Sequence, residues 1–250
     1  MKKIYWLVAI LLILCGIAYG DEIKEWIIDI FNPIISGCDV KVEKPSELII
    51  FKPEFESIDL TFGNESPKND KAVIACFGAA FTGDCLNEFT HDNIASDHAG
   101  GGKAYKGYEC PRNTGAFVFE QGKWNFFYGD SMEKEYAAKL EAVAKNNGCG
   151  FSQEMIIYDG KRVEGSRPEG NIFVFRTLCE KNGELLVIES ERAMKYGTFI
   201  NALEAYGVKH ALYLDMGTWC YGWYRPNGKG IVDLHSQTHN FHTNWLVFKK

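Results

Sequence analysis

The chain has 250 residues, of which 46% are hydrophobic and 24% are charged. This composition is typical of a soluble globular protein with an ample core and excludes a disordered or repetitive chain. The formal net charge is -6 and no run of Lys and Arg occurs, which argues against a nucleic-acid partner because phosphate-backbone binding needs clustered cations. A small soluble ligand fits better.

The N-terminus has the pattern of an export signal. Lys2 and Lys3 precede an apolar run over residues 4–17, and Gly20 completes a small-x-small cleavage site. The apolar run is shorter than the ~20 residues that a spanning helix needs, so an uncleaved anchor is the less favoured alternative. We therefore expect an exported protein, periplasmic or secreted, that meets the membrane only through this signal or anchor segment.

Lipoprotein attachment at Cys15 is disfavoured because Leu14 stands where such sites need a small residue. We expect three parts: a signal peptide over residues 1–20, a lead segment over residues 21–45, and one domain over residues 46–250. No internal repeat or low-complexity linker divides this domain.

Alternating and continuous apolar runs predict many short strands. In chain order they are two strands within residues 46–62 separated at Pro53, then 72–77, 115–119, 123–128, 154–158, 172–178, 185–190, 211–214 and a terminal strand within 240–250. Asn182-Gly183 between two apolar runs is a strong β-hairpin signal. Residues 82–111 are polar and contain three consecutive glycines, so we expect a long loop that binds a ligand or moves.

Two segments have helical spacing. The first opens with the pattern of a capping box at Asp130-Ser131-Met132-Glu133 and ends at Asn147-Gly148, and the second runs over residues 196–206 before Gly207. The predicted fold class is α+β: a single domain of mixed, twisted β-sheets with two main α-helices packed against them.

Export makes disulfides possible. The chain has 8 cysteines, and removal of Cys15 with the signal peptide leaves an odd number. Our preferred pair is Cys85 with Cys110, while Cys76 and Cys179 fit small buried side chains inside strands. No C-x-x-C pair occurs, so the spacing matches no zinc pattern.

Asp215 ends the apolar strand over residues 211–214 and precedes Met216-Gly217-Thr218. A strand end fixes the position of a carboxylate, and a following glycine lets a ligand approach the backbone. The plain alternative is an aspartate that caps a turn.

The motifs around this strand resemble those of the phosphodiester glycosidase family. Residues 207–217 read G-V-K-H-A-L-Y-L-D-M-G, similar to the family's G-V-x-x-A-L-x-L-D-G-G. The earlier motifs occur in the family's order between residues 54 and 225: residues 74–81, Asn113 to Phe117, Gln153 with the Asp159-Gly160 turn, Phe175 to Thr177, and residues 187–191. Two departures stand out, since Phe77-Gly78-Ala79 replaces Asn-Gly-Gly, and Met216 replaces a glycine of the D-G-G loop.

The resemblance implies hydrolysis of a sugar-1-phosphodiester at its glycosidic bond, without a metal or other cofactor. Such a reaction needs a carboxylate beside the developing positive charge on the sugar and a base for the water. Asp215 and Glu191 are the candidates for the two roles, and Arg176 is the candidate phosphate clamp because its planar fork suits two phosphate oxygens. The candidate substrate-binding residues are Phe77, Gly78, Asn113, Thr177, Gly217, Thr218, Trp219 and Tyr221.

Each assignment has an alternative. Glu191 fits a solvated strand end equally well, and Arg176 inside a strand is also suited to pairing with a structural carboxylate. The aromatic residues at 219–224 fit a sugar-stacking platform or a cover for the core. His235, His239 and His242 suggest a metal, but the terminal segment reads as a strand, which would point His239 and His242 to opposite sides.

Three function classes follow, of which the third is a disulfide-stabilised secreted interaction protein without a pocket, in which residues 82–111 would pack flat over Asp215. The first is an exported hydrolase acting on a sugar-1-phosphodiester or related envelope glycan. The second is a non-catalytic carbohydrate- or envelope-polymer-binding protein on the same fold, which is favoured if Phe77 and Met216 fill the pocket.

Overall fold

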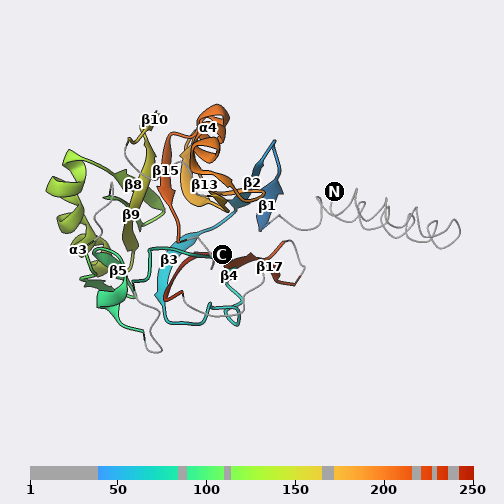
Figure 1. Cartoon of the computed structure of the whole chain (residues 1–250). Helices are drawn as coiled ribbons and strands as arrows, with labels where there is room; N and C mark the ends of the chain where they lie inside the picture. The colour runs from blue at the N-terminus through green and yellow to red at the C-terminus, as the bar shows by residue number, and fades with distance from the viewer. Residues whose placement is uncertain are drawn as a thin grey trace, which may run out of the picture.

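The computed structural model describes residues 39–83, 89–109, 114–164, 172–215, 221–226, 230–235 and 242–250. Two β-sheets pack face to face, and two helices cover the outer face of the larger sheet (Figure 1). This arrangement confirms the predicted α+β fold with two main helices.

The larger sheet has 11 strands. Its main path runs β1-β2-β13-β12-β15-β9-β5-β6, and β7, β8 and β10 join it through β9. The strands on the path are β1 (Val40–Glu43), β2 (Leu48–Pro53), β13 (Glu184–Ser190), β12 (Arg176–Lys181), β15 (His210–Tyr213), β9 (Cys149–Tyr158), β5 (His98–Gly100) and β6 (Lys103–Tyr105). The strands that join through β9 are β7 (Thr114–Glu120), β8 (Lys123–Phe127) and β10 (Lys161–Arg162).

The smaller sheet has 5 strands in the order β17-β16-β4-β18-β3. They are β17 (Val232–Leu234), β16 (Gly222–Tyr224), β4 (Val73–Gly78), β18 (Asn244–Lys249) and β3 (Ser57–Phe62). A separate pair joins β11 (Ile172–Phe173) to β14 (Met194–Lys195). All pairs between these described strands are antiparallel, so the expected mixture of parallel and antiparallel pairs resolves to antiparallel sheets.

The main core fills the space between the two sheets. Phe77, Leu246 and Phe248 of the smaller sheet pack there with side chains such as Phe151 and Leu212 of the larger one, all 0% exposed. Alternation along a strand sends neighbouring residues to opposite faces, so the other face of the larger sheet is also apolar and needs a cover.

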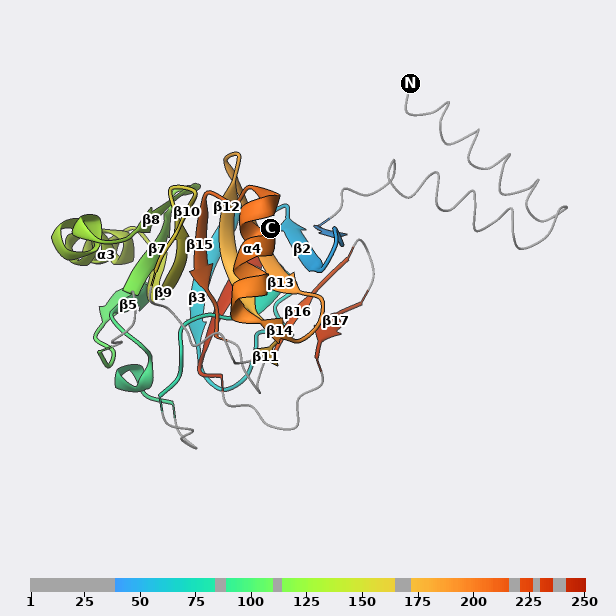
Figure 2. The same cartoon turned by 45° about the horizontal axis from the view of Figure 1, so that its top comes forward.

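The two helices provide that cover. Helix α4 (Tyr196–Tyr206) lies across β12, β13 and β15 (Figure 2) and buries Phe199 and Leu203 against them. Gly207 ends it in the left-handed region at φ 82°, as the sequence predicts. Helix α3 (Ala137–Lys145) follows a π-helical segment, η2 (Met132–Tyr136), and packs Leu140 and Val143 beside β7.

The start of that first helical segment is not a capping box. The Ser131 hydroxyl accepts a hydrogen bond from the Tyr128 backbone N–H at 3.1 Å and is 3.0 Å from the Tyr128 carbonyl oxygen. Ser131 therefore closes the turn before the helix and makes no cap bond to the helix itself. The expectation was wrong because Ser competes for nearby backbone groups on either side of it.

The expected long loop over residues 82–111 is more ordered than its composition indicates. It contains a short 3-10 helix, η1 (His91–Asn93), and the hairpin of β5 and β6. Gly101 and Gly102 take positive φ values of 59° and 79° to turn this hairpin, so the glycines serve the turn. Gly100 is inside β5, where a Cβ would lie 2.2 Å from the Leu60 carbonyl oxygen.

Three cysteines lie among the described residues, and all three are buried free thiols: Cys76, Cys149 and Cys179. Burial raises the pKa of the Cys179 thiol to about 12 and also raises those of the other two. Such thiols are unreactive in the folded state. Cys85 and Cys110, the expected disulfide pair, lie outside the described residues, as do the signal peptide and Cys15.

Within the described ranges, no helix has the length and apolar character needed to cross a membrane.

Candidate functional site

The β12–β13 hairpin places a buried charge pair at its open end. Asn182 and Gly183 form the turn with φ values of 52° and 78°, and the register then pairs Lys181 with Glu184 and, at the far end, Arg176 with Glu189. Leu178 and Val187 on the same two strands belong to the core between the sheets. Because side chains alternate, Arg176 and Glu189 point into the same space.

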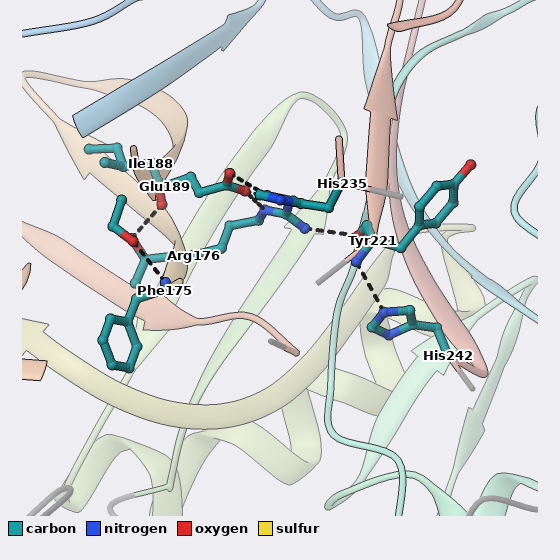
Figure 3. Close-up of polar contacts among 9 residues, drawn as sticks. Phe175, Arg176, Ile188, Glu189, Tyr221, His235 and His242 are labelled. Carbon is teal, nitrogen blue, oxygen red and sulfur yellow. Dashed lines mark hydrogen bonds and ion pairs between the residues drawn. The ribbon is translucent and has the colours of Figure 1, made fainter. Parts of the chain in front are cut away.

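Arg176 is bound at all three of its guanidinium nitrogens (Figure 3). Its Nε donates to Glu189 Oε2 at 2.7 Å, one terminal nitrogen donates to the same oxygen, and the other donates to the Tyr221 carbonyl oxygen at 2.8 Å. The Arg176 and Glu189 side chains are 0% and 2% exposed. Tyr221 precedes β16, so this arginine ties the larger sheet to the smaller one.

Glu189 has a second polar partner. His235, just after β17, lies with its Nε2 2.7 Å from Glu189 Oε1, and since the carboxylate accepts, the ring nitrogen donates. Burial alone would raise the pKa of the Glu189 carboxyl, but the charge of Arg176 and the hydrogen bond from His235 outweigh it and hold that pKa below its usual 4.5. Glu189 is therefore ionised at neutral pH.

Asp215 pairs with a buried histidine. His242 Nδ1 lies 3.2 Å from Asp215 Oδ2, and His242 Nε2 accepts the Tyr221 backbone N–H at 3.4 Å. An Nε2 that accepts leaves the proton of a neutral imidazole on Nδ1, so His242 donates to Asp215. The Asp215 side chain is 17% exposed and that of His242 is 2% exposed, so the aspartate alone of the two faces solvent.

The backbone around Asp215 is also held. Its N–H donates to the Ala79 carbonyl oxygen at 2.8 Å, just beyond the end of β4. The Asn244 side chain then bonds both the N–H and the carbonyl oxygen of Ala80, at 2.7 and 2.9 Å. The ends of β15, β4 and β18 thus meet at the Asp215 carboxylate.

Taken together, the contacts form one connected group, which we call the inter-sheet network: Asp215, His242, Tyr221, Arg176, Glu189 and His235. It brings together Asp215, Arg176 and Tyr221 of the residues chosen from sequence. It adds Glu189, His235 and His242, which sequence reasoning did not choose. A signal for Glu189 was present, because a two-residue Asn182-Gly183 turn already fixes Arg176 opposite Glu189.

Glu191 does not join this network. Its carboxylate is 46% exposed and lies 3.7 Å from Lys44 Nζ, which matches the solvated strand end left open as its alternative. Arg176 likewise matches its alternative, a partner of a structural carboxylate, because its guanidinium donates two hydrogen bonds to Glu189.

The other candidate binding residues have varied positions. Phe77 is wholly buried in the main core, with the Arg176 guanidinium carbon 5.3 Å from its ring centre. Thr177 is buried on the opposite face, 3.0 Å from Cys179 Sγ. The remaining candidates, Asn113, Gly217, Thr218 and Trp219, lie outside the described residues, as does Met216.

Gly78 leaves room for His242. A Cβ at position 78 would lie 2.8 Å from His242 Nδ1 and 3.4 Å from the Asp215 carbonyl oxygen. This glycine therefore holds the Asp215 partner in place. Among the described residues, no group of three or more His, Cys, Asp and Glu side chains is arranged to hold a metal.

Gly78→Ala is expected to lower the free energy of unfolding by about 1–3 kcal/mol, because the new methyl group displaces a packed ring. Gly197→Ala is the matched control, since position 197 in α4 has nothing within 4 Å of an added Cβ. The control is expected to be neutral or to stabilise by up to about 1 kcal/mol through helix propensity. Urea unfolding measures both, and equal values for the two variants would contradict the close packing of His242.

Acidification is expected to remove the stability that Glu189 provides. Because its folded-state pKa lies below the unfolded value, this stability is present at neutral pH and is lost as pH falls from about 4.5 through the lowered pKa. Glu189→Gln has no such titration, so the gap in unfolding free energy between wild type and this variant should narrow from pH 5 to pH 3. A gap that stays constant would count against an ionised Glu189.

The chain matches no protein-family model and no curated protein sequence. Among solved structures it is similar to the zebrafish N-acetylglucosamine-1-phosphodiester alpha-N-acetylglucosaminidase catalytic domain, auto-inhibited by its pro-peptide. The TM-score is 0.54 at 11% sequence identity, over 86% of this chain and 83% of that chain. The likeness is one of fold.

A second solved structure, a hypothetical protein from Synechocystis, aligns with a TM-score of 0.47 and 14% identity over 85% of this chain and 62% of that one. The architecture of this chain resembles that of the zebrafish catalytic domain.

Proposed function

We propose that this chain is an exported hydrolase that cleaves the glycosidic bond of a sugar-1-phosphodiester or of a related envelope glycan. One observation carries the proposal: on a fold like that of a glycosidase catalytic domain, the partly exposed Asp215 carboxylate is oriented by the buried His242. A carboxylate held by a buried donor at a strand end is suited to act on a bound substrate.

The leaving group of this reaction needs little protonation. A phosphate monoester leaves as a weak base, so the group to be supplied is a carboxylate beside the sugar. In the proposed step, a water oxygen bonds to the anomeric carbon while the bond from that carbon to the phosphate oxygen breaks. The phosphate takes the bonding electron pair, and the water proton passes to Asp215, which His242 keeps in position.

The rest of the inter-sheet network holds the Asp215 carboxylate indirectly, through His242. The Arg176 and Glu189 pair fixes the Tyr221 carbonyl, and the Tyr221 N–H in turn fixes the His242 tautomer. We assign Arg176 this positioning role instead of a phosphate clamp. Contacts to the substrate from Asn113, Gly217, Thr218 and Trp219 remain part of the proposal.

The test is an assay of sugar released from a panel of sugar-1-phosphodiesters by wild type and Asp215→Ala. We expect turnover by wild type and none above background by the variant. Equal turnover by both proteins would reject Asp215 as the catalytic residue. Mass spectrometry of the protein from an exporting host tests the other part, with cleavage after Gly20 as the expected result.

A second function, carbohydrate or envelope-polymer binding without turnover, is favoured by one observation. Arg176 is engaged with Glu189, so the arginine expected to hold a phosphate is occupied. Binding of the panel by wild type without any released sugar would establish this alternative.

A further inference from the structure

Gln153 lies beside the inter-sheet network on the same face of the larger sheet. It is on β9 between Phe151 and Met155, whose side chains belong to the core between the sheets. Leu212 pairs with Met155, so the register carried two residues along each strand places Gln153 opposite Leu214, directly before Asp215. The Leu214 N–H in turn donates to the Arg176 carbonyl oxygen at 3.0 Å. Arg176, Leu214 and Gln153 thus occupy one row across three strands.

The Gln153 side chain is buried with half of its carboxamide bonded. Its Oε1 accepts the Glu154 backbone N–H at 2.8 Å, which determines which end of the amide is oxygen and which is nitrogen. Its Nε2 has no hydrogen-bond partner among the described residues, although the side chain is 0% exposed. A buried donor without a partner is costly, so such a group in a folded protein calls for an explanation.

An oxygen of a bound ligand would give this donor a partner. Leu214, the middle residue of the row, directly precedes the proposed catalytic Asp215, and the Arg176 guanidinium in the same row is already bound to Glu189 and Tyr221. We propose that Gln153 is a substrate-binding residue whose Nε2 donates a hydrogen bond to an oxygen of the bound sugar phosphate. This inference rests on the proposed function, and it names a donor that the sequence motifs do not assign to that role.

The experiment compares three variants of the full chain. Gln153→Met removes the donor at similar volume, and Gln153→Glu keeps an oxygen for the Glu154 N–H but replaces the amide. Gln121→Glu makes the same chemical change in the β7–β8 turn and is the control. Titration calorimetry gives the Kd for a phosphodiester analogue, N-acetylglucosamine 1-(methyl phosphate) with its anomeric oxygen replaced by a methylene group so that it is not hydrolysed, and for N-acetylglucosamine and dimethyl phosphate. Proton–nitrogen NMR follows the Gln153 side-chain amide, assigned by its loss in Gln153→Met.

We expect both Gln153 variants to raise the Kd for the phosphodiester analogue about tenfold or more, with Gln121→Glu unchanged. We also expect the Gln153 amide signals to shift when ligand saturates the wild type. A merely structural glutamine would not shift. If the Gln153 variants also bind dimethyl phosphate more weakly, the acceptor is a phosphate oxygen. If they bind the free sugar more weakly, the acceptor is a sugar oxygen.

The inference is overturned if both Gln153 variants bind the phosphodiester analogue within twofold of wild type, or if the amide signals stay in place. Turnover of the hydrolysable phosphodiester, measured on the same samples, separates the two proposals. Normal turnover with an unchanged Kd in Gln153→Met agrees with the hydrolase proposal and rejects Gln153 as a substrate-binding residue. Binding that depends on Gln153, without turnover, supports Gln153 as a binding residue and contradicts the hydrolase proposal. If the wild type binds no probe, both proposals are rejected.

Discussion

Arg176→Met is expected to lower the free energy of unfolding by about 3–5 kcal/mol, because it leaves the Glu189 carboxylate buried without its cation. The side chains of the pair are 0% and 2% exposed, so water cannot replace the lost partner. His235 remains as a donor, but its hydrogen bond goes to Glu189 Oε1, whereas Arg176 holds Oε2. Urea unfolding at pH 7 measures the loss.

The matched control is Arg162→Met, which removes an arginine from an ion pair with Glu204 that is 39% and 37% exposed. Surface pairs of this kind are worth about 0–1 kcal/mol, so this variant should unfold close to wild type. The double variant Arg176→Met/Glu189→Leu should recover part of the loss, since it removes the stranded charge. Equal losses in Arg176→Met and Arg162→Met would show that Glu189 is not buried as described.

Asp215→Asn is expected to lower kcat/KM for the sugar-1-phosphodiester by about 10²–10⁴-fold, the usual contribution of a general base. The amide oxygen still accepts the His242 Nδ1–H, so the fold and the His242 position should persist. What the variant loses is the negative charge and the ability to take a proton. Steady-state assays with a thermal melt on the same sample measure both effects.

Asp130→Asn is the control for this change, because the Asp130 side chain is 91% exposed and pairs only at the surface with Lys134. It should have wild-type activity. If the loss of kcat/KM in Asp215→Asn comes with a melting temperature well below that of the wild type, Asp215 has a role in stability, and its catalytic role is contradicted.

Local sequence patterns predicted most of the strands because each depends on neighbours in the chain. The turn at Asn182-Gly183, the strand break at Pro53 and the end of α4 at Gly207 all follow from the backbone conformations these residues favour. The carboxylate at Asp215 was found for the same reason, since it directly follows an apolar run.

The missed features depend on partners far away in sequence. His242 was considered as a metal ligand in the terminal segment. The packing of β18 beside β4 brings it to Gly78 and to Asp215, and Asp215 is 27 residues before it. Strand β9 was predicted from residue 154 onwards, but it begins at Cys149. Asn147-Gly148 was read as the end of the preceding helix, and Gly150 was not considered. A Cβ at Gly150 would lie 2.9 Å from Val118 Cγ1, so this glycine allows close packing within β9.

The order of strands in the smaller sheet has a kinetic consequence. Strands β3 and β4 are close in sequence, yet β18 lies between them and pairs with both, Leu246 with Leu60 on one side and with Phe77 on the other. Pairing over so many intervening residues makes the folding transition slow, because a large loop must close before any contact compensates. Until β18 arrives, β3 and β4 each present an unpaired edge to solvent, and this nascent intermediate is where self-association should begin.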